Sequence, residues 1–336
     1  MIVLRMKPDI LPGFSRETIE LPPDDEGQVV ATLVSRKRGA PTEKAVLYVH
    51  GYVDYFFNTE LAERYNAHGL DFYAIDLRKY GRSLLPHQSP NFALSLEEYF
   101  EELDAAIDRI RNRDGHSFVL LNGHSTGGLT GSLYADARRG AGTVDAVFLN
   151  SPWFDMNASW FDEHVLINVA SAVGYVAPGL VIPSGFSPLY GQSLHQDYFG
   201  EWDYRLDWKP NEGFPVMAGW VRAIKAGHVK LQSGLQIHAP VLVMFSTESS
   251  WPKRFDPILY RTDSVLDVAD IDRFADGIGS DVTKIRIPSG VHDLVLSAKA
   301  VRENVYHELF DWIRSRGWLE DDRGQSRINP IQSGAA

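Results

Sequence analysis

Short apolar runs rich in β-branched and aromatic residues recur along the chain, and stretches with helical periodicity lie between them. Near-continuous apolar runs are typical of strands in a parallel sheet that is covered on both faces. Such runs predict strands at residues 45–51, 72–77, 117–122, 145–150, 240–246 and 282–287. An alternating stretch at residues 29–37 predicts an antiparallel strand that precedes them.

Helices are predicted between these strands. In residues 96–112, apolar side chains recur at a spacing of about 3.6 residues, with acidic residues on the opposite face. Further helices are predicted at residues 59–68, 127–138, 267–276 and 297–316. Because strands and helices alternate, the pattern predicts an α/β fold with a doubly wound, mostly parallel sheet.

The alternation stops after Pro152. Residues 153–235 show no strand run followed by a regular helix, and they contain Trp153, Trp160, Trp202, Trp208 and Trp220. A stretch of this length is predicted to form an inserted cap subdomain rather than a loop. Residues 1–152 and 236–320 then form the core, and the polar, Gly/Ser-containing residues 321–336 form a flexible tail.

Composition excludes several functions. The chain has no Cys, which rules out disulfides, thiolate nucleophiles and Cys-based zinc sites, and which fits a cytoplasmic location. Its net charge of −11 argues against nucleic acid as a partner. We find neither a signal peptide nor an apolar run long enough to span a membrane, although transient contact with lipid fits the sequence. No metal-ligand spacing or phosphate-binding loop is evident, so we expect no metal and no cofactor.

A G-x-S-x-G motif provides the candidate chemistry. Residues 123–127 read Gly-His-Ser-Thr-Gly, after a predicted strand and before a predicted helix. This arrangement is typical of a nucleophile elbow, in which a tight turn presents the serine hydroxyl. Ser125 is therefore the candidate nucleophile.

A serine nucleophile needs a base and an acid, and both follow the elbow in this topology. His292 follows the predicted strand 282–287 and precedes the last helix, which makes it the candidate base. For the acid we favour Asp263, because it lies just before a helix; Glu248, Asp256 and Asp267 are the alternatives. The acid would hold the imidazole in the tautomer that accepts the serine proton.

Two backbone N–H groups are needed to stabilise a developing oxyanion. One is predicted from Thr126, the residue after the nucleophile. The other is predicted from Tyr52, because His50-Gly51-Tyr52 ends the strand 45–51.

These motifs together resemble the α/β-hydrolase superfamily, and within it the branch of monoglyceride lipases, lysophospholipases and serine aminopeptidases. The resemblance rests on residues 48–51, 76–83, 123–128 and 291–294. It implies an eight-stranded sheet, a lid after the sixth strand and hydrolysis of esters, thioesters or amides without a cofactor. Lys79 stands where that branch usually has a glycine, so the backbone of its loop is expected to differ.

We therefore expect a serine hydrolase that cleaves carboxylic esters through an acyl-enzyme on Ser125. The substrate would be a small molecule with a small to medium acyl group, an aromatic ester or a monoacylglycerol-like ester. The aromatic residues Trp153, Phe154 and Trp160 are the candidate pocket residues. The alternatives are an aminopeptidase or amidase, a thioesterase, and a non-catalytic binding protein of the same fold. An aminopeptidase would need an anionic subsite, for which Asp155, Asp162, Glu163, Glu201 and Asp203 are candidates.

Overall fold

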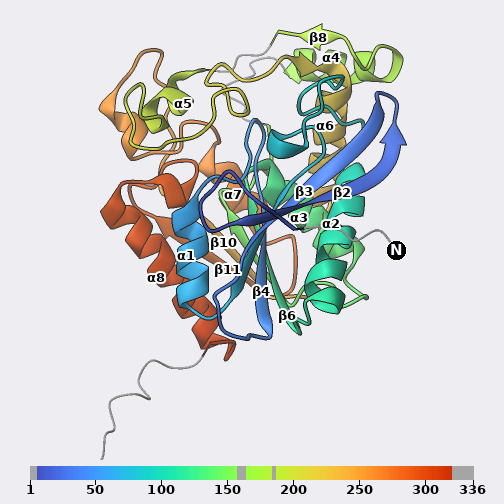
Figure 1. Cartoon of the computed structure of the whole chain (residues 1–336). Coiled ribbons are helices and arrows are strands. Elements are labelled where there is room, and N and C mark those ends of the chain that lie inside the picture. Colours follow the sequence, from blue (N-terminus) through green and yellow to red (C-terminus); the bar gives the residue numbers. More distant parts are fainter. Residues whose placement is uncertain (1–5, 157–163, 184–186, 320–336) are drawn as a thin grey trace, which may run out of the picture.

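A twisted central sheet organises the molecule. The computed structural model describes residues 6–156, 164–183 and 187–319 (Figure 1). Within these ranges the sheet contains nine strands in the order β1-β2-β3-β5-β4-β6-β7-β10-β11. Their bounds are β1 Lys7–Pro8, β2 Ser15–Asp24, β3 Gly27–Arg36, β4 Lys44–Val49, β5 Asp71–Asp76, β6 Phe118–His124, β7 Ala146–Asn150, β10 Val241–Ser246 and β11 Val282–Ile287.

Most of the sheet is parallel. Strands β5, β4, β6, β7, β10 and β11 run parallel to one another, whereas β3 pairs antiparallel with both β2 and β5. The predicted doubly wound, mostly parallel sheet and its antiparallel first strand are confirmed. Eight strands of five or more residues match the expected number, and the two-residue β1 adds a ninth at the edge. All carboxyl ends of the parallel strands lie at one edge, where open α/β sheets bind ligands.

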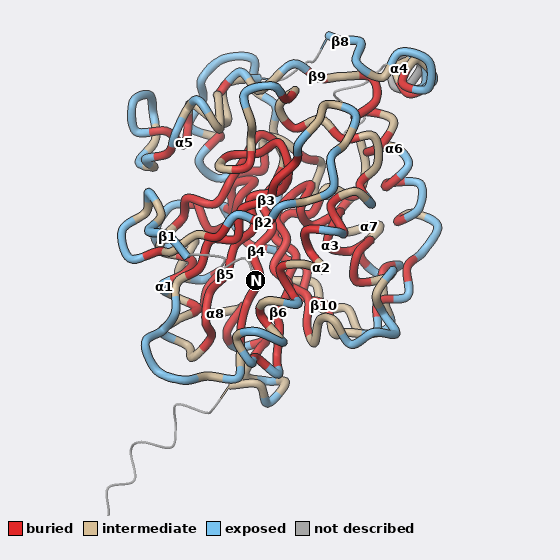
Figure 2. The backbone as a smooth tube through the Cα atoms, turned by 45° about the vertical axis from the view of Figure 1, so that its right-hand side comes forward, coloured by how far each residue is buried: buried red, intermediate tan, exposed pale blue. Residues whose placement is uncertain are grey.

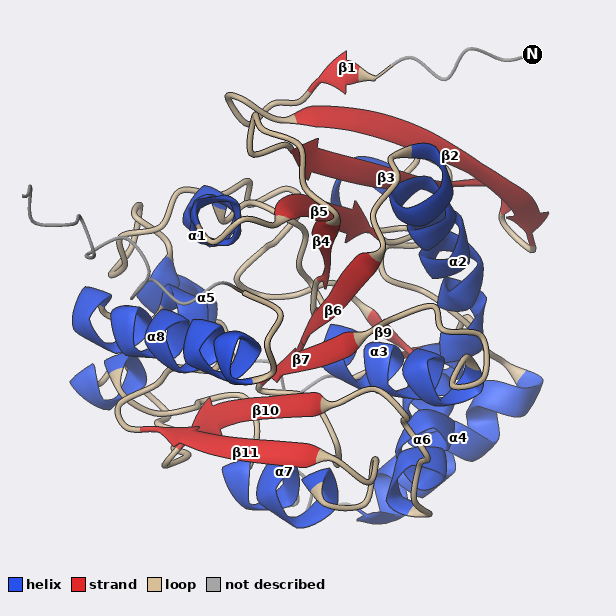
Figure 3. Cartoon of the chain, turned by 90° about the horizontal axis from the view of Figure 1, so that it is seen from below, coloured by secondary structure: helices blue, strands red, loops and turns tan. Residues whose placement is uncertain are grey.

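Helices cover both faces of the sheet. Helices α1 (Thr59–Ala67) and α8 (Lys299–Ser315) lie on one face, and α2 (Phe100–Asp108), α3 (Thr126–Ala137) and α7 (Val268–Ala275) lie on the other (Figure 3). In β4, Leu47 packs with the α2–α3 side and Val46 with the α1–α8 side, because successive strand residues point to opposite faces. The central strands β5, β6, β7 and β10 are accordingly buried along their whole length (Figure 2).

The segment between β7 and β10 contains regular structure that the sequence pattern does not predict. It holds α4 (His164–Val176), α5 (Leu189–Leu194) and α6 (Ala218–Gln232), with the two-residue strands β8 (Val181–Ile182) and β9 (Val216–Met217). Helix α6 packs against α3 and adds Trp220, Val221 and Ile224 to the core over the sheet. The predicted tail, residues 321–336, lies outside the described residues.

Among the residues that the structure describes, no helix is both long enough and apolar enough to cross a membrane.

Candidate active site

Ser125 lies on the sharp turn between β6 and α3. Its backbone angles are φ 53° and ψ −117°, a conformation that is uncommon for a residue with a side chain. Hydrogen bonds hold the turn from both sides. The Ser125 N–H donates to the Asn150 carbonyl over 3.1 Å, and its carbonyl accepts from the Trp153 N–H over 3.0 Å. The serine is therefore fixed at the carboxyl end of the sheet.

The elbow needs glycine because backbones approach very closely there. A Cβ on Gly127 would lie 2.3 Å from the His50 carbonyl oxygen and 2.4 Å from that of Val49. A Cβ on Gly123 would lie 2.6 Å from the Gly127 carbonyl oxygen. These contacts seat the first turn of α3 directly against the end of β4, beside the His50-Gly51-Tyr52 loop.

His292 and Asp263 come together at the same edge of the sheet. The His292 Nδ1 lies 2.9 Å from the Asp263 Oδ2, and both side chains are buried. The other oxygen of Asp263 accepts from the backbone N–H groups of Val265 and Leu266, each over 2.8 Å. A carboxylate accepts only, so His292 donates through Nδ1 and its Nε2 can accept a proton.

The other three candidate acids have different roles in the structure. Asp256 accepts from the Ile258 N–H, and Asp267 accepts from the Ala269 N–H at the start of α7. Glu248 is exposed, and its backbone carbonyl accepts from the Asp263 N–H. Of the four acids weighed, Asp263 is the one whose carboxylate contacts His292.

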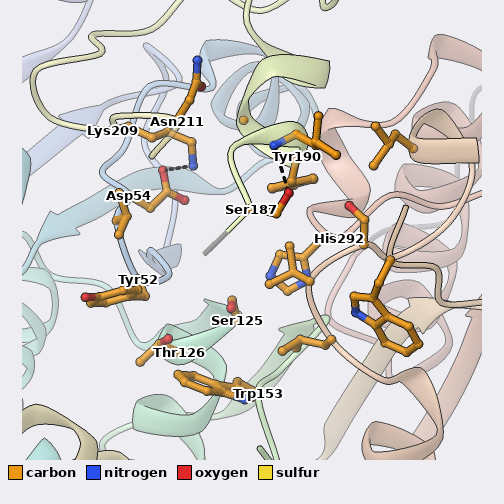
Figure 4. Close-up of a pocket in the computed structure, with 18 of the residues that line it drawn as sticks. Tyr52, Asp54, Ser125, Thr126, Trp153, Ser187, Tyr190, Lys209, Asn211 and His292 are labelled. Atoms are coloured by element: carbon orange, nitrogen blue, oxygen red, sulfur yellow. Dashed lines mark hydrogen bonds and ion pairs between the residues drawn. The ribbon is translucent and has the colours of Figure 1, made fainter. Parts of the chain in front are cut away.

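Two backbone segments border Ser125 where an oxyanion would form. Thr126 is the first residue of α3, and the N–H groups of a first helical turn have no partner within the helix. The second segment is the His50-Gly51-Tyr52 loop after β4. It lies very close to Ser125, because a Cβ on Gly51 would be 3.0 Å from the Ser125 Cβ. Burial lowers the pKa of His50, whose neutral ring accepts from the Leu77 N–H over 3.1 Å and so anchors this loop. Figure 4 shows Tyr52 and Thr126 on one side of Ser125 and His292 on the other.

A cavity of about 510 Å³ opens over Ser125 and His292. Its lining combines apolar and polar side chains from the core, from the segment between β7 and β10, and from the segment after β10. The lining includes Tyr52, Asp54, Thr126, Trp153, Met156, Ser187, Leu189, Tyr190, Lys209, Asn211, Trp251, Leu259, Val265 and Leu266.

An ion pair between the buried Asp54 and the partly buried Lys209 forms part of the cavity wall. The Lys209 Nζ lies 2.7 Å from the Asp54 Oδ1 (Figure 4). Burial of Asp54 opposes its ionisation. The charge and hydrogen bond of Lys209, together with the nearby His124 and His50, outweigh burial, so the pKa of Asp54 lies below its usual value. The pair joins the loop after β4 to the segment between β7 and β10, so it bridges two parts of the cavity wall.

One group of side chains near Ser125 has ligand atoms that could hold a metal. Among the described residues, Asp54, His124 and Asp293 bring one such atom each to within 4.8 Å of one another. Both carboxylates already have partners: Asp54 binds Lys209, and Asp293 accepts from the Asn150 Nδ2 over 2.7 Å. The cluster is thus satisfied by protein groups.

The predicted pocket residues have separate outcomes. Trp153 lines the cavity. Phe154 does not: it is buried in the core over the sheet, because Trp153 is held beside Ser125 and the next side chain turns inward. The prediction for Phe154 is wrong, and Trp160 lies outside the described residues.

Sequence reasoning missed several cavity residues, among them Tyr190, Lys209, Asn211 and Trp251. None of them belongs to a motif, and each reaches the cavity through long-range packing. For Trp251, the available signal was the unusual length of the segment between the strand 240–246 and Asp263. The other three lie in residues 153–235, which the sequence predicts as a cap but whose contacts it does not predict.

Lys79 keeps a backbone that suits glycine. Its φ is 65°, in the left-handed region that glycine adopts most readily. The buried Lys79 Nζ contacts the Asp24 Oδ2 at 2.6 Å and the Glu26 Oε2 at 2.7 Å. These two contacts to the turn between β2 and β3 offset the cost of a left-handed conformation for a residue with a side chain.

The sheet, the strained serine turn and the buried Asp–His pair at the carboxyl ends of the strands define an α/β-hydrolase. Residues 40–249 match the family described as serine aminopeptidase, S33, and the chain belongs to this family. A curated relative, monoacylglycerol lipase of Mycolicibacterium smegmatis (strain ATCC 700084 / mc(2)155), is 25% identical over 272 residues, which cover 80% of this chain and 88% of that protein.

Solved structures show the same fold. A soluble variant of monoglyceride lipase from Saccharomyces cerevisiae, in complex with a substrate analogue, has a TM-score of 0.66 at 16% identity and covers 89% of this chain and 96% of its own. The monoacylglycerol lipase of Paleococcus ferrophilus has a TM-score of 0.63 at 20% identity, with coverage of 84% and 98%. The chain is therefore a hydrolase of the branch that contains monoglyceride lipases.

Proposed function

We propose that this protein is a serine hydrolase that cleaves carboxylic esters through an acyl-enzyme on Ser125. The observation that carries the proposal is that Ser125 and His292 line one cavity, while the buried Asp263 carboxylate binds the Nδ1 of His292 from behind. The curated relative supports an ester of glycerol or a similar alcohol as the substrate class.

The reaction follows from the hydrogen bonds. Asp263 holds the Nδ1–H of His292, which leaves Nε2 to take the proton of the Ser125 hydroxyl as Oγ attacks the acyl carbonyl. The oxyanion of the tetrahedral intermediate would be stabilised by the N–H groups of Tyr52 and Thr126. His292 then protonates the leaving alcohol, and a water molecule repeats the sequence to release the acid.

Charges along the cavity favour an ester over a peptide with a free amino group. An aminopeptidase needs a carboxylate to bind that amine. Among the described lining residues, the carboxylate is that of Asp54, and it is already paired with Lys209. Glu201 binds Arg302 instead, and neither Asp155 nor Asp203 lines the cavity.

Residues from the segment between β7 and β10 support its role as a cap. Ser187, Tyr190 and Lys209 come from this segment and close the cavity over Ser125. Tyr190 also contacts the catalytic edge directly, because its hydroxyl accepts from the Asp293 N–H over 2.9 Å. We propose that the segment covers the bound ester during the reaction.

The test compares the wild type with Ser125→Ala on p-nitrophenyl esters from acetate to palmitate, on monoacylglycerols and on aminoacyl amides. We expect ester turnover in the wild type and its loss in Ser125→Ala, with both proteins folded by circular dichroism. Turnover of the amides alone would replace the proposal with an aminopeptidase. No turnover, together with no labelling of Ser125 by a fluorophosphonate, would indicate a non-catalytic binding protein.

A further inference from the structure

The segment between β10 and α7 contains a loop whose two ends lie side by side. It comprises residues 251–261, and we call it the wall loop. Its two ends are tied together beside Asp263. The Ser250 N–H donates to the Asp263 carbonyl, and the Asp263 N–H donates to the Glu248 carbonyl, each over 2.9 Å. The hydroxyls of Ser250 and Thr262 also lie 2.6 Å apart. The loop therefore leaves and rejoins the chain at a fixed neck, and its far end can vary without moving Asp263.

The wall loop has internal order. Asp256 accepts from the Ile258 N–H over 2.8 Å and begins the 3₁₀ turn η5, Pro257–Tyr260. Within this turn Leu259 is buried, and the Thr262 hydroxyl donates to the Ile258 carbonyl over 2.9 Å. A loop bonded to itself in this way can act as a rigid wall.

The loop is also fastened to the cap segment. The Tyr260 hydroxyl donates to the Phe199 carbonyl over 2.6 Å, and the rings of Phe199 and Phe255 lie 4.1 Å apart. Helix α5 of the cap packs against η5. The roof of the cavity is thus built from two separate segments that meet over Ser125.

The cavity has two chemically different sides. The wall loop supplies Trp251, Pro252, Leu259 and the exposed Lys253, and the residues just after it supply Ser264, Val265 and Leu266. This side is apolar apart from Lys253 and Ser264. The other side holds the Asp54–Lys209 pair and the Asn211 amide, whose buried Oδ1 has no hydrogen-bond partner among the described residues. An apolar acyl chain gains most from the first side, and a hydroxyl-bearing alcohol from the second.

We propose that the wall loop sets the length of the acyl chain that the enzyme accepts, with Trp251 as the residue that limits it. This inference rests on the proposed ester hydrolysis. Trp251 follows the fixed neck directly, lines the cavity and is still 39% exposed, so it stands at the outer boundary of the apolar side. An acyl chain longer than the apolar side must displace this ring or pass it.

The test measures kcat/KM for two ester series, one with a varied acyl chain and one with a varied alcohol, in the wild type, Trp251→Ala and Tyr198→Ala. Tyr198 is the matched control, because it is an exposed aromatic residue at 46% that does not line the cavity. We expect Trp251→Ala to raise the dodecanoate-to-butyrate ratio of kcat/KM by about tenfold and to leave the alcohol series unchanged. Tyr198→Ala should keep the wild-type ratios.

The outcomes separate the two proposals. An unchanged acyl profile in an active, folded Trp251→Ala enzyme overturns the role of the wall loop and leaves the ester hydrolysis intact. A change in the alcohol series instead overturns the assignment of the two sides. Absence of Ser125-dependent ester turnover in the wild type overturns the proposed function itself. Should Trp251→Ala fail to fold, Trp251→Leu provides the same comparison with a smaller change in volume.

Discussion

The Asp263 carboxylate holds Nδ1 of His292 over 2.9 Å while its other oxygen accepts two backbone N–H groups. Together these three hydrogen bonds fix the orientation of the carboxylate, and the carboxylate in turn fixes the orientation of the imidazole. Because Asp263 is completely buried, water cannot replace these bonds. The pair therefore sets which ring nitrogen of His292 faces the cavity.

We predict that Asp263→Asn lowers kcat for ester hydrolysis about ten-thousandfold. An asparagine keeps the shape but presents an N–H₂ group to Nδ1, which favours the tautomer with its proton on Nε2, so the ring can no longer accept the Ser125 proton. Steady-state kinetics on a p-nitrophenyl ester measure the effect. Asp267→Asn is the control: Asp267 begins α7 without touching His292, and this variant should retain most of the activity.

An element can be predicted from the sequence when the residues that define it are contiguous in the chain. The strands of the parallel sheet and the serine turn are contiguous patterns, and the sequence predicts them closely. Strand β2 is not predicted, because its exposed face is polar and it contains Pro22 and Pro23. The cap helices are not predicted either, because the elements they pack against are distant in the chain. Helix α6, which packs against α3, is an example.

The cavity shows the same limit. Trp153 follows Pro152, just after the end of β7. Because neighbouring parallel strands end at the same edge of the sheet, its position close to Ser125 could be predicted from the sequence. Lys209 binds Asp54, which lies 155 residues away in the sequence, and no sequence motif predicts that contact. Phe154 shows the converse, because an aromatic residue next to a cavity residue can serve the core instead.

The Asp54–Lys209 pair gives a prediction for stability. We expect Lys209→Met to lower the free energy of unfolding by about 3 kcal/mol at neutral pH, because it leaves a buried carboxylate without its counter-charge. The double variant Asp54→Asn with Lys209→Met should recover part of this loss. Urea unfolding measures both variants, and Lys253→Met, an exposed lysine that also lines the cavity, is the control. Equal losses in Lys209→Met and Lys253→Met would contradict the prediction.

The close approach at the elbow gives a second stability prediction. Gly127→Ala places a methyl group 2.3 Å from the His50 carbonyl oxygen, so α3 must move away from β4. We expect a loss of about 3 kcal/mol in unfolding free energy, together with a large loss of activity. Gly140→Ala is the matched control, since a Cβ there meets no atom within 4 Å. Thermal melting and ester turnover of the two variants decide the point, and similar melting temperatures would argue against the close packing.

Acid should destabilise the protein through His228, which supports the segment beside Ser125. The His228 Nε2 lies 3.0 Å from the Trp153 carbonyl, to which it donates, and its buried Nδ1 has no hydrogen-bond partner among the described residues. A proton on Nδ1 would add an unpartnered charge to the core. Burial accordingly lowers the pKa of His228 to about 4.

The sign of the effect follows from proton linkage. An unfolded histidine titrates near pH 6.5, so between about pH 6.5 and pH 4 the unfolded chain binds a proton that the folded protein does not. The contribution of His228 is complete above pH 6.5 and is lost as the pH falls toward 4, by about 3 kcal/mol in all. His228→Gln, which can still donate to the Trp153 carbonyl, should lose less stability between pH 7.5 and pH 4.5 than the wild type. Urea unfolding at the two pH values tests this, and equal losses in both proteins would show that another group is responsible.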